Sequence, residues 1–161
     1  MHKINWKALF TSLVFSLGTG GLAAFITAGS MNQYERMYQP QLAPPGWLFP
    51  VVWTILYILM GIAAYLIYES EAKNAAQESE KQAALEIYAV QLVVNFIWPI
   101  LFFNLNAYLL SFAWLLLLWY LILQTIRKFY AIDKTAGILL IPYLLWVTFA
   151  GYLNLAIALY T

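Results

Sequence analysis

The chain has 161 residues, of which 64% are hydrophobic, 18% are aromatic and only 9% are charged, and its formal net charge is +1. Soluble domains carry about 25% charged residues, so this composition excludes a soluble globular protein and predicts an integral membrane protein in contact with the lipid bilayer. The small net charge argues against nucleic acid as a partner, and the absence of cysteine excludes disulfides, thiolate metal sites and covalently attached haem.

Long uncharged segments define the predicted helices. Asp, Glu, Lys and Arg are absent from residues 8–34, 37–68, 87–126 and 135–161. A transmembrane helix needs about 20 apolar residues, so the first, second and fourth of these segments hold one span each. The segment 87–126 holds two spans, joined by the turn-forming sequence NLNA. We therefore predict a single domain, residues 1–161, that folds as an all-α integral membrane bundle of five transmembrane helices at about 6–29, 47–69, 84–103, 108–128 and 135–159.

The first predicted helix carries a small residue at every fourth position, namely Ser12, Ser16, Gly20, Ala24 and Ala28. In lipid, this pattern lets another backbone approach closely. It is typical of a packing seam inside a bundle and also of a dimer face. We favour the internal seam, because a five-helix bundle must bury part of this helix.

A loop at residues 31–46 connects the first two helices, and a loop of that length is often functional. Pro44 and Pro45 stiffen its end, and we expect it to fold as a lid over the outer mouth of the bundle. Pro50 falls in the first turn of the second helix, and Trp53 follows one turn below as an expected pocket wall.

Two further features shape the later helices. The segment 69–86 is rich in Ala, Glu, Lys and Gln, which favour helix, so the second or third helix is expected to extend beyond the membrane there. Pro99 and Pro142 lie inside the third and fifth predicted spans, where a proline removes a backbone hydrogen bond and kinks the helix.

Cationic residues predict the orientation. One side of the predicted bundle carries Lys3, Lys7, Lys73, Lys81, Arg127, Lys128 and Lys134, and the other side carries only Arg36. Cytoplasmic loops of membrane proteins are enriched in Lys and Arg. We therefore predict a multi-pass protein of the cell membrane with its N-terminus in the cytoplasm and its C-terminus outside.

The spans contain aromatic and amide side chains but no ionisable ones, which argues against a pump, a coupled carrier or an ion channel. The only histidine is His2, so neither a zinc site, an axial haem ligand nor a hydrolytic triad is expected. Large aromatic faces with a few amides suit a flat apolar ligand. On helical spacing, such faces are formed by Trp53 with Tyr57, by Asn95 with Trp98 and Phe102, and by Trp146 with Ala150, Leu153 and Asn154. Each asparagine suits an inter-helix hydrogen bond as well as a ligand contact.

Three motifs in order carry a family resemblance: PQLAPPGWLFPVVWTILYILMGIAAYLIY, NFIWPILFF and PYLLWVTFAGYLN. They resemble the tryptophan-rich sensory protein / translocator protein family (TspO/MBR), whose mitochondrial members were formerly called peripheral-type benzodiazepine receptors. The resemblance covers essentially the whole chain, and the short C-terminus favours a bacterial member. It implies a five-helix bundle, usually a homodimer, that binds porphyrins, sterols and isoquinoline- or benzodiazepine-type drugs.

The resemblance also implies individual pocket residues. Trp53 in PVVW, Asn95 and Trp98 in N-x-x-W-P, and Trp146 and Ala150 in WVTFA match the family's pocket motifs, with Leu153, Asn154 and the loop residue Tyr34 alongside. The sterol motif of animal members is incomplete, because Leu155 replaces its tyrosine and no Lys or Arg follows. A porphyrin therefore suits this chain better than cholesterol, and the lack of a histidine ligand in the spans favours a metal-free porphyrin.

We accordingly expect a membrane receptor or carrier that binds porphyrins such as protoporphyrin IX under the 31–46 loop and takes part in tetrapyrrole handling and stress response. No cofactor is expected beyond the porphyrin itself, as ligand or substrate. Arg36 is the candidate partner of the porphyrin carboxylates. One alternative is a light- and oxygen-dependent porphyrin-degrading enzyme with Trp53 and Trp146 as redox residues. Another is a non-enzymatic membrane scaffold or sensor.

Overall fold

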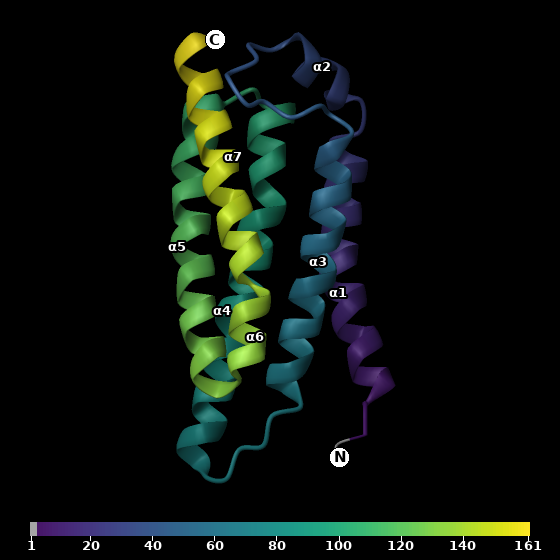
Figure 1. Ribbon diagram of the computed structural model, residues 1–161, viewed down its shortest axis with the longest axis vertical. Helices are drawn as coiled ribbons and strands as arrows, with labels where there is room; N and C mark the ends of the chain where they lie inside the picture. The colour runs from purple at the N-terminus through teal and green to yellow at the C-terminus, as the bar shows by residue number, and fades with distance from the viewer. Residues whose placement is uncertain (1–2) are drawn as a thin grey trace.

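The computed structural model describes residues 3–161, and five helical segments long and apolar enough to cross a membrane lie side by side in it as a bundle (Figure 1). This architecture confirms the predicted all-α fold of a multi-pass membrane protein. His2 lies outside the described residues. The elements are α1 (Trp6–Ile26), α2 (Ser30–Arg36), α3 (Leu48–Tyr68), α4 (Ala75–Pro99), η1 (Ile100–Asn104), α5 (Tyr108–Ile132), α6 (Lys134–Leu139) and α7 (Ile141–Tyr160).

The two ends of the bundle differ. The described N-terminal end of the chain and the connection between α3 and α4 lie at one end, whereas α2, the loop that follows it and the C-terminus lie at the other (Figure 1). The predicted loop at 31–46 is thus partly helical, since α2 begins at Ser30. It covers the end of the bundle at which α1 stops and α3 begins.

The helix that extends beyond its predicted span is α4, which forms the third span, and not α3, which forms the second. α3 ends at Tyr68, whereas α4 already begins at Ala75. The side chain of Asn74 caps this start by accepting a hydrogen bond from the backbone N–H of Gln77 at 2.9 Å. The Ala-, Glu- and Gln-rich sequence therefore forms the first turns of α4.

The two prolines expected to kink spans act in different ways. Pro99 ends the regular part of α4, and a π-helical turn, η1, follows, in which the N–H of Leu105 donates to the carbonyl of Ile100 at 3.0 Å. Pro142 lies inside the fifth span, Lys134–Tyr160, as expected. The fifth span is divided at Leu140 into α6 and α7, and Pro142 occupies the first turn of α7, where its missing N–H leaves no helical bond unmade.

The N-terminal half of the small-residue stripe on α1 is an internal seam, as favoured above. Ser12 Oγ donates a hydrogen bond of 2.7 Å to the carbonyl of Gly61 on α3. A Cβ atom added at Gly61 would lie 2.7 Å from Ser16 Oγ and 3.1 Å from the backbone Cα of Leu13. The two helices can pack this closely only because position 61 has no side chain.

We expect Gly61→Ala to lower the free energy of unfolding by about 1–3 kcal/mol, because the added methyl group forces α1 and α3 apart. Gly21→Ala is the matched control, since a Cβ atom there meets nothing within 4 Å. Thermal unfolding in the same detergent micelle measures both. Equal melting temperatures for the two variants would show that the α1–α3 contact tolerates a side chain.

Candidate ligand-binding cavity

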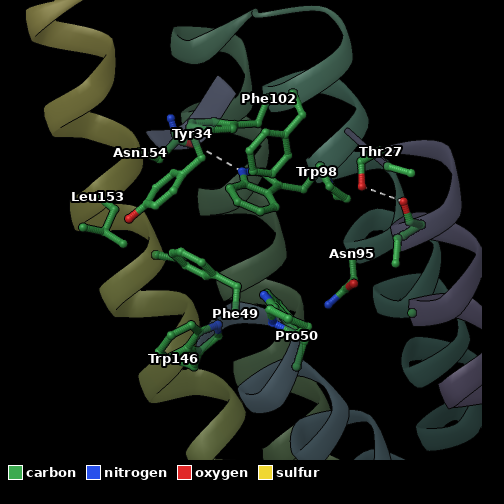
Figure 2. A pocket seen from close by; sticks show the side chains of 18 of the residues that line it. Thr27, Tyr34, Phe49, Pro50, Asn95, Trp98, Phe102, Trp146, Leu153 and Asn154 are labelled. Atoms are coloured by element: carbon green, nitrogen blue, oxygen red, sulfur yellow. Dashed lines mark hydrogen bonds between the residues drawn. The ribbon is translucent and has the colours of Figure 1, made fainter. Parts of the chain in front are cut away.

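A cavity of about 300 Å³ lies in the half of the bundle that α2 covers, and it is enclosed by α1, α3, α4 with η1, and α7 (Figure 2). Ligand pockets of proteins measure about 300–1,000 Å³ and are mostly apolar. Its walls are formed by Gly20, Ala23, Ala24, Thr27, Ala28, Gly29, Tyr34, Phe49, Pro50, Trp53, Tyr57, Asn95, Trp98, Pro99, Phe102, Phe103, Trp146, Ala150, Leu153, Asn154 and Ile157.

The structure brings the candidate pocket residues together around this one cavity. Those that line it are Tyr34, Trp53, Tyr57, Asn95, Trp98, Trp146, Ala150, Leu153 and Asn154. They come from α2, α3, α4 and α7. Arg36 is the exception: it ends α2, is exposed to solvent and does not line the cavity.

One whole wall was not predicted from the sequence. Six small residues in the last turns of α1 and in the turn that follows it form this wall, namely Gly20, Ala23, Ala24, Thr27, Ala28 and Gly29. At Ala24 and Ala28 the small-residue stripe is therefore a cavity wall and not a seam, because short side chains leave the volume unfilled. Gly20 serves as both, since a Cβ atom added there would lie 2.3 Å from Tyr57 Cε2. Phe49, Phe103 and Ile157 were also missed. Phe49 is four residues from Trp53 on α3 and Ile157 is four residues from Leu153 on α7, and this spacing pointed to both.

A chain of buried hydrogen bonds fixes the floor of the cavity. Tyr57 on α3 donates to Asn95 Oδ1 at 2.5 Å, and Asn95 Nδ2 donates to the hydroxyl of Tyr143 at 2.6 Å. Tyr143 in turn donates to Gln91 Oε1 at 2.7 Å. Each bond joins two helices, and polar groups inside a membrane protein need such partners. Asn95 thus makes the inter-helix hydrogen bonds that its position allowed.

The second asparagine, Asn154, holds an aromatic wall in place. Its Oδ1 accepts from Trp98 Nε1 at 3.0 Å and from Ser111 Oγ at 3.1 Å, and its Nδ2 donates to the carbonyl of Tyr108 at 2.9 Å. Trp98 then stacks on Phe102 with ring centroids 5.4 Å apart. Figure 2 shows this pair of rings beside Asn154. The amide therefore orients a flat aromatic surface that faces the cavity.

The opposite wall carries an unpaired donor. Trp146 on α7 lies beside Phe49 (Figure 2), edge to face with ring centroids 5.8 Å apart. The ring centroids of Trp53 and Tyr57 are 5.7 Å apart. Nε1 of Trp146 is buried, and within the described chain it donates to no other atom. A buried N–H without an acceptor is costly, so a movement of the ring that brought this group against an acceptor would be favourable.

The water-facing end of the cavity is closed by the lid. Tyr34 is only 4% exposed, its hydroxyl donates to the carbonyl of Pro44 at 3.0 Å, and its ring packs edge to face on Phe49 at 5.0 Å. Burial raises the pKa of the Tyr34 hydroxyl, which keeps it protonated as a donor. The lid is also tied to α7, since Tyr152 donates to the carbonyl of Gln41 at 2.7 Å.

Comparison with known proteins supports the motifs quoted above. The model of the TspO/MBR family matches residues 10–160. The tryptophan-rich protein TspO of Chlorobaculum tepidum is 36% identical over 155 residues, covering 96% of this chain and 95% of that protein. The protein of the same name from Archaeoglobus fulgidus is 37% identical over 157 residues, covering 97% and 98%. The translocator protein of Bos taurus is 34% identical over 144 residues, covering 89% and 83%. These matches confirm the family resemblance.

Tyr143→Phe should lower the free energy of unfolding by about 1–2 kcal/mol, because it leaves Asn95 Nδ2 and Gln91 Oε1 buried without their partner. Tyr120→Phe removes the same atom from an exposed position of α5 and serves as the control. Denaturant titration of both variants in detergent measures the difference. A stability for Tyr143→Phe equal to that of the control would mean that the buried chain contributes nothing to packing.

Proposed function

This chain belongs to the TspO/MBR family, and we propose that it is a receptor or carrier that binds a flat, apolar, porphyrin-like molecule in the cavity between its membrane helices. The observation that carries the proposal is the cavity itself. It is bounded on two sides by tryptophans, Trp98 on α4 and Trp146 on α7, and it is covered at the water-facing end by α2. Aromatic walls suit the faces of a planar ring system.

The polar groups of the wall support a ligand that carries a hydrogen-bond acceptor. The amide groups of Asn95 and Asn154 are already bonded to other helices. Among the buried donors that no described residue pairs, Trp146 Nε1 is the one that belongs to a cavity-lining residue. A porphyrin or an isoquinoline- or benzodiazepine-type drug offers a planar apolar body, and the drugs and the porphyrin side chains offer oxygen acceptors. We therefore extend the proposal to both ligand classes.

The charges at the two ends of the bundle support an orientation and a role for Arg36. The cationic residues Lys7, Lys73 and Arg127 belong to the end that holds the described N-terminal end of the chain, and we propose that this end is cytoplasmic (Figure 1). Arg36 lies at the end of α2, at the opposite face. We propose that it pairs with porphyrin carboxylates that project past the lid. The exposed apolar side chains of α1 and α5 are available for pairing of two copies in the bilayer.

Light-dependent porphyrin degradation is the second candidate function. It is favoured by the position of two oxidisable indoles, Trp53 and Trp146, on the wall of the same cavity. Trp53 also lies 5.7 Å from Tyr57 and 6.2 Å from Tyr143 between ring centroids. A photoexcited porphyrin held there could take an electron from an adjacent indole, with dioxygen as the further oxidant.

Ala150→Phe should weaken porphyrin binding by about tenfold or more, because Ala150 is a buried wall residue and a phenyl ring there fills the cavity. Quenching of tryptophan fluorescence by protoporphyrin IX in the dark measures the affinity. Ala113→Phe, on the exposed face of α5, is the control and should bind as the wild type does. Quenching of the wild type that never saturates would instead favour a scaffold or sensor without a ligand site.

For the degradation candidate, Trp53→Phe and Trp146→Phe should each slow the light-dependent loss of the porphyrin Soret band about tenfold, because phenylalanine keeps an aromatic ring but is much harder to oxidise. Dark affinity is measured in parallel so that loss of binding is not mistaken for loss of chemistry. Trp119→Phe, on α5 outside the cavity, is the control. Photodegradation retained in both cavity variants would end the proposal that these indoles take part.

Arg36→Ala should weaken the binding of protoporphyrin IX a few-fold and leave an uncharged isoquinoline ligand unaffected, because an exposed ion pair contributes about 0–1 kcal/mol. The difference should shrink as the salt concentration rises. Competition between the two ligands in wild type and variant measures both affinities. An equal loss for the charged and the uncharged ligand would exclude the carboxylate pairing.

A further inference from the structure

A second hollow lies on the outside of the bundle, between α3 and α7. It is an apolar groove of about 560 Å³ lined by Val52, Ile55, Leu56, Leu59, Pro142, Leu145, Trp146 and Phe149. α3 packs closely against α1 and α6 but not against α7, which leaves this side open. Ile55 and Leu145 are 52% and 64% exposed, and both belong to membrane-length helical segments. The groove therefore opens toward lipid.

Trp146 is the wall that the groove and the cavity share. It is the residue common to the linings of both. Its ring contacts Phe49, a cavity residue, at 5.8 Å and Phe149, a groove residue, at 5.6 Å between ring centroids. One aromatic side chain thus separates the interior of the bundle from the bilayer at this level.

Trp146 differs in its hydrogen bonding from three other tryptophans of the membrane helices. The indole N–H groups of Trp98, Trp114 and Trp119 donate to protein oxygens at 3.0, 2.8 and 2.8 Å. Nε1 of Trp146 is buried and has no acceptor among the described residues. A change of its rotamer would therefore break no hydrogen bond, and only packing contacts with its neighbours would oppose the movement.

The end of the cavity that α2 covers offers a ligand no comparable path of entry. Opening it requires α2 to lift, which breaks the hydrogen bond from Tyr34 to the carbonyl of Pro44 and the one from Tyr152 to the carbonyl of Gln41. An apolar ligand also partitions into lipid in preference to water. It reaches the groove between α3 and α7 at a far higher concentration than it reaches the lid.

We propose that this groove is a lateral entrance through which a flat apolar molecule dissolved in the bilayer passes between α3 and α7 into the cavity, with Trp146 as its gate. The proposal rests on the proposed ligand-binding function and adds the route of entry. An entrance differs from a binding site in kinetics. Blocking it slows association and dissociation by the same factor and leaves the dissociation constant unchanged.

The test compares two double variants in lipid nanodiscs. Ile55→Phe with Leu145→Phe fills the groove from both helices, at exposed positions that do not line the cavity. Leu116→Phe with Leu117→Phe makes the same additions on the exposed face of α5 and is the control. Phe149→Ala acts in the opposite sense, because it removes the ring that packs on the outer side of Trp146. Stopped-flow tryptophan quenching by protoporphyrin IX in the dark measures both rates.

We expect the filled groove to slow association and dissociation about fivefold or more and Phe149→Ala to accelerate both, with dissociation constants as in the wild type. If both groove variants keep wild-type rates and saturable binding, the proposed entrance is overturned and the proposed function stands. The ligand would then enter by another path, for example past the small residues of α1. A weaker affinity caused only by faster dissociation would make the groove part of the binding site and also overturn the entrance. Absence of saturable quenching in the wild type would remove the proposed function and the entrance together.

Discussion

Inside a bilayer, a polar group has no water to bond, so the helices must supply each other's hydrogen-bond partners. In this protein, the bonds from Tyr57 to Asn95, from Asn95 to Tyr143 and from Tyr143 to Gln91 meet that constraint. They join α3, α4 and α7 in the middle of the bundle. Because amide and hydroxyl groups bond only in narrow geometries, the chain sets how these three helices are rotated. Their aromatic side chains consequently converge on one space.

That space remains open because of α1. In the N-terminal half of α1, Ser12 and Ser16 bring the helix into close contact with Gly61 on α3. Toward the other half, Ala24 of α1 and Ala28 in the turn after it line the cavity and are too small to fill the space before the rings of α4 and α7. The same stripe thus closes one half of the bundle and leaves a cavity in the other. The lid and Trp146 then separate this cavity from water and from lipid.

Much of this could be predicted from local sequence, and the reasons are physical. Charge-free segments of the right length identify spans without any tertiary information, and side chains four residues apart, such as Trp53 and Tyr57, must share a face of a helix. The wall formed by α1 could not be predicted, because a small residue makes a seam or a cavity depending on how its helix lies against the next. The role of Tyr143 was missed for the same reason, since a hydrogen bond between helices depends on their rotation. The break at Leu140 could not be predicted, because Pro142 is compatible with a kinked helix as well as with an interrupted one.

We propose that the cavity, rather than the lipid-facing surface, holds the ligand. A structure of the protein with protoporphyrin IX bound in the dark would locate the ligand directly. We expect a planar ligand between Trp98 and Trp146, beneath Tyr34, with an acceptor atom within hydrogen-bond distance of Trp146 Nε1. A porphyrin found only on an outer face of the helices, with the cavity unchanged, would contradict it.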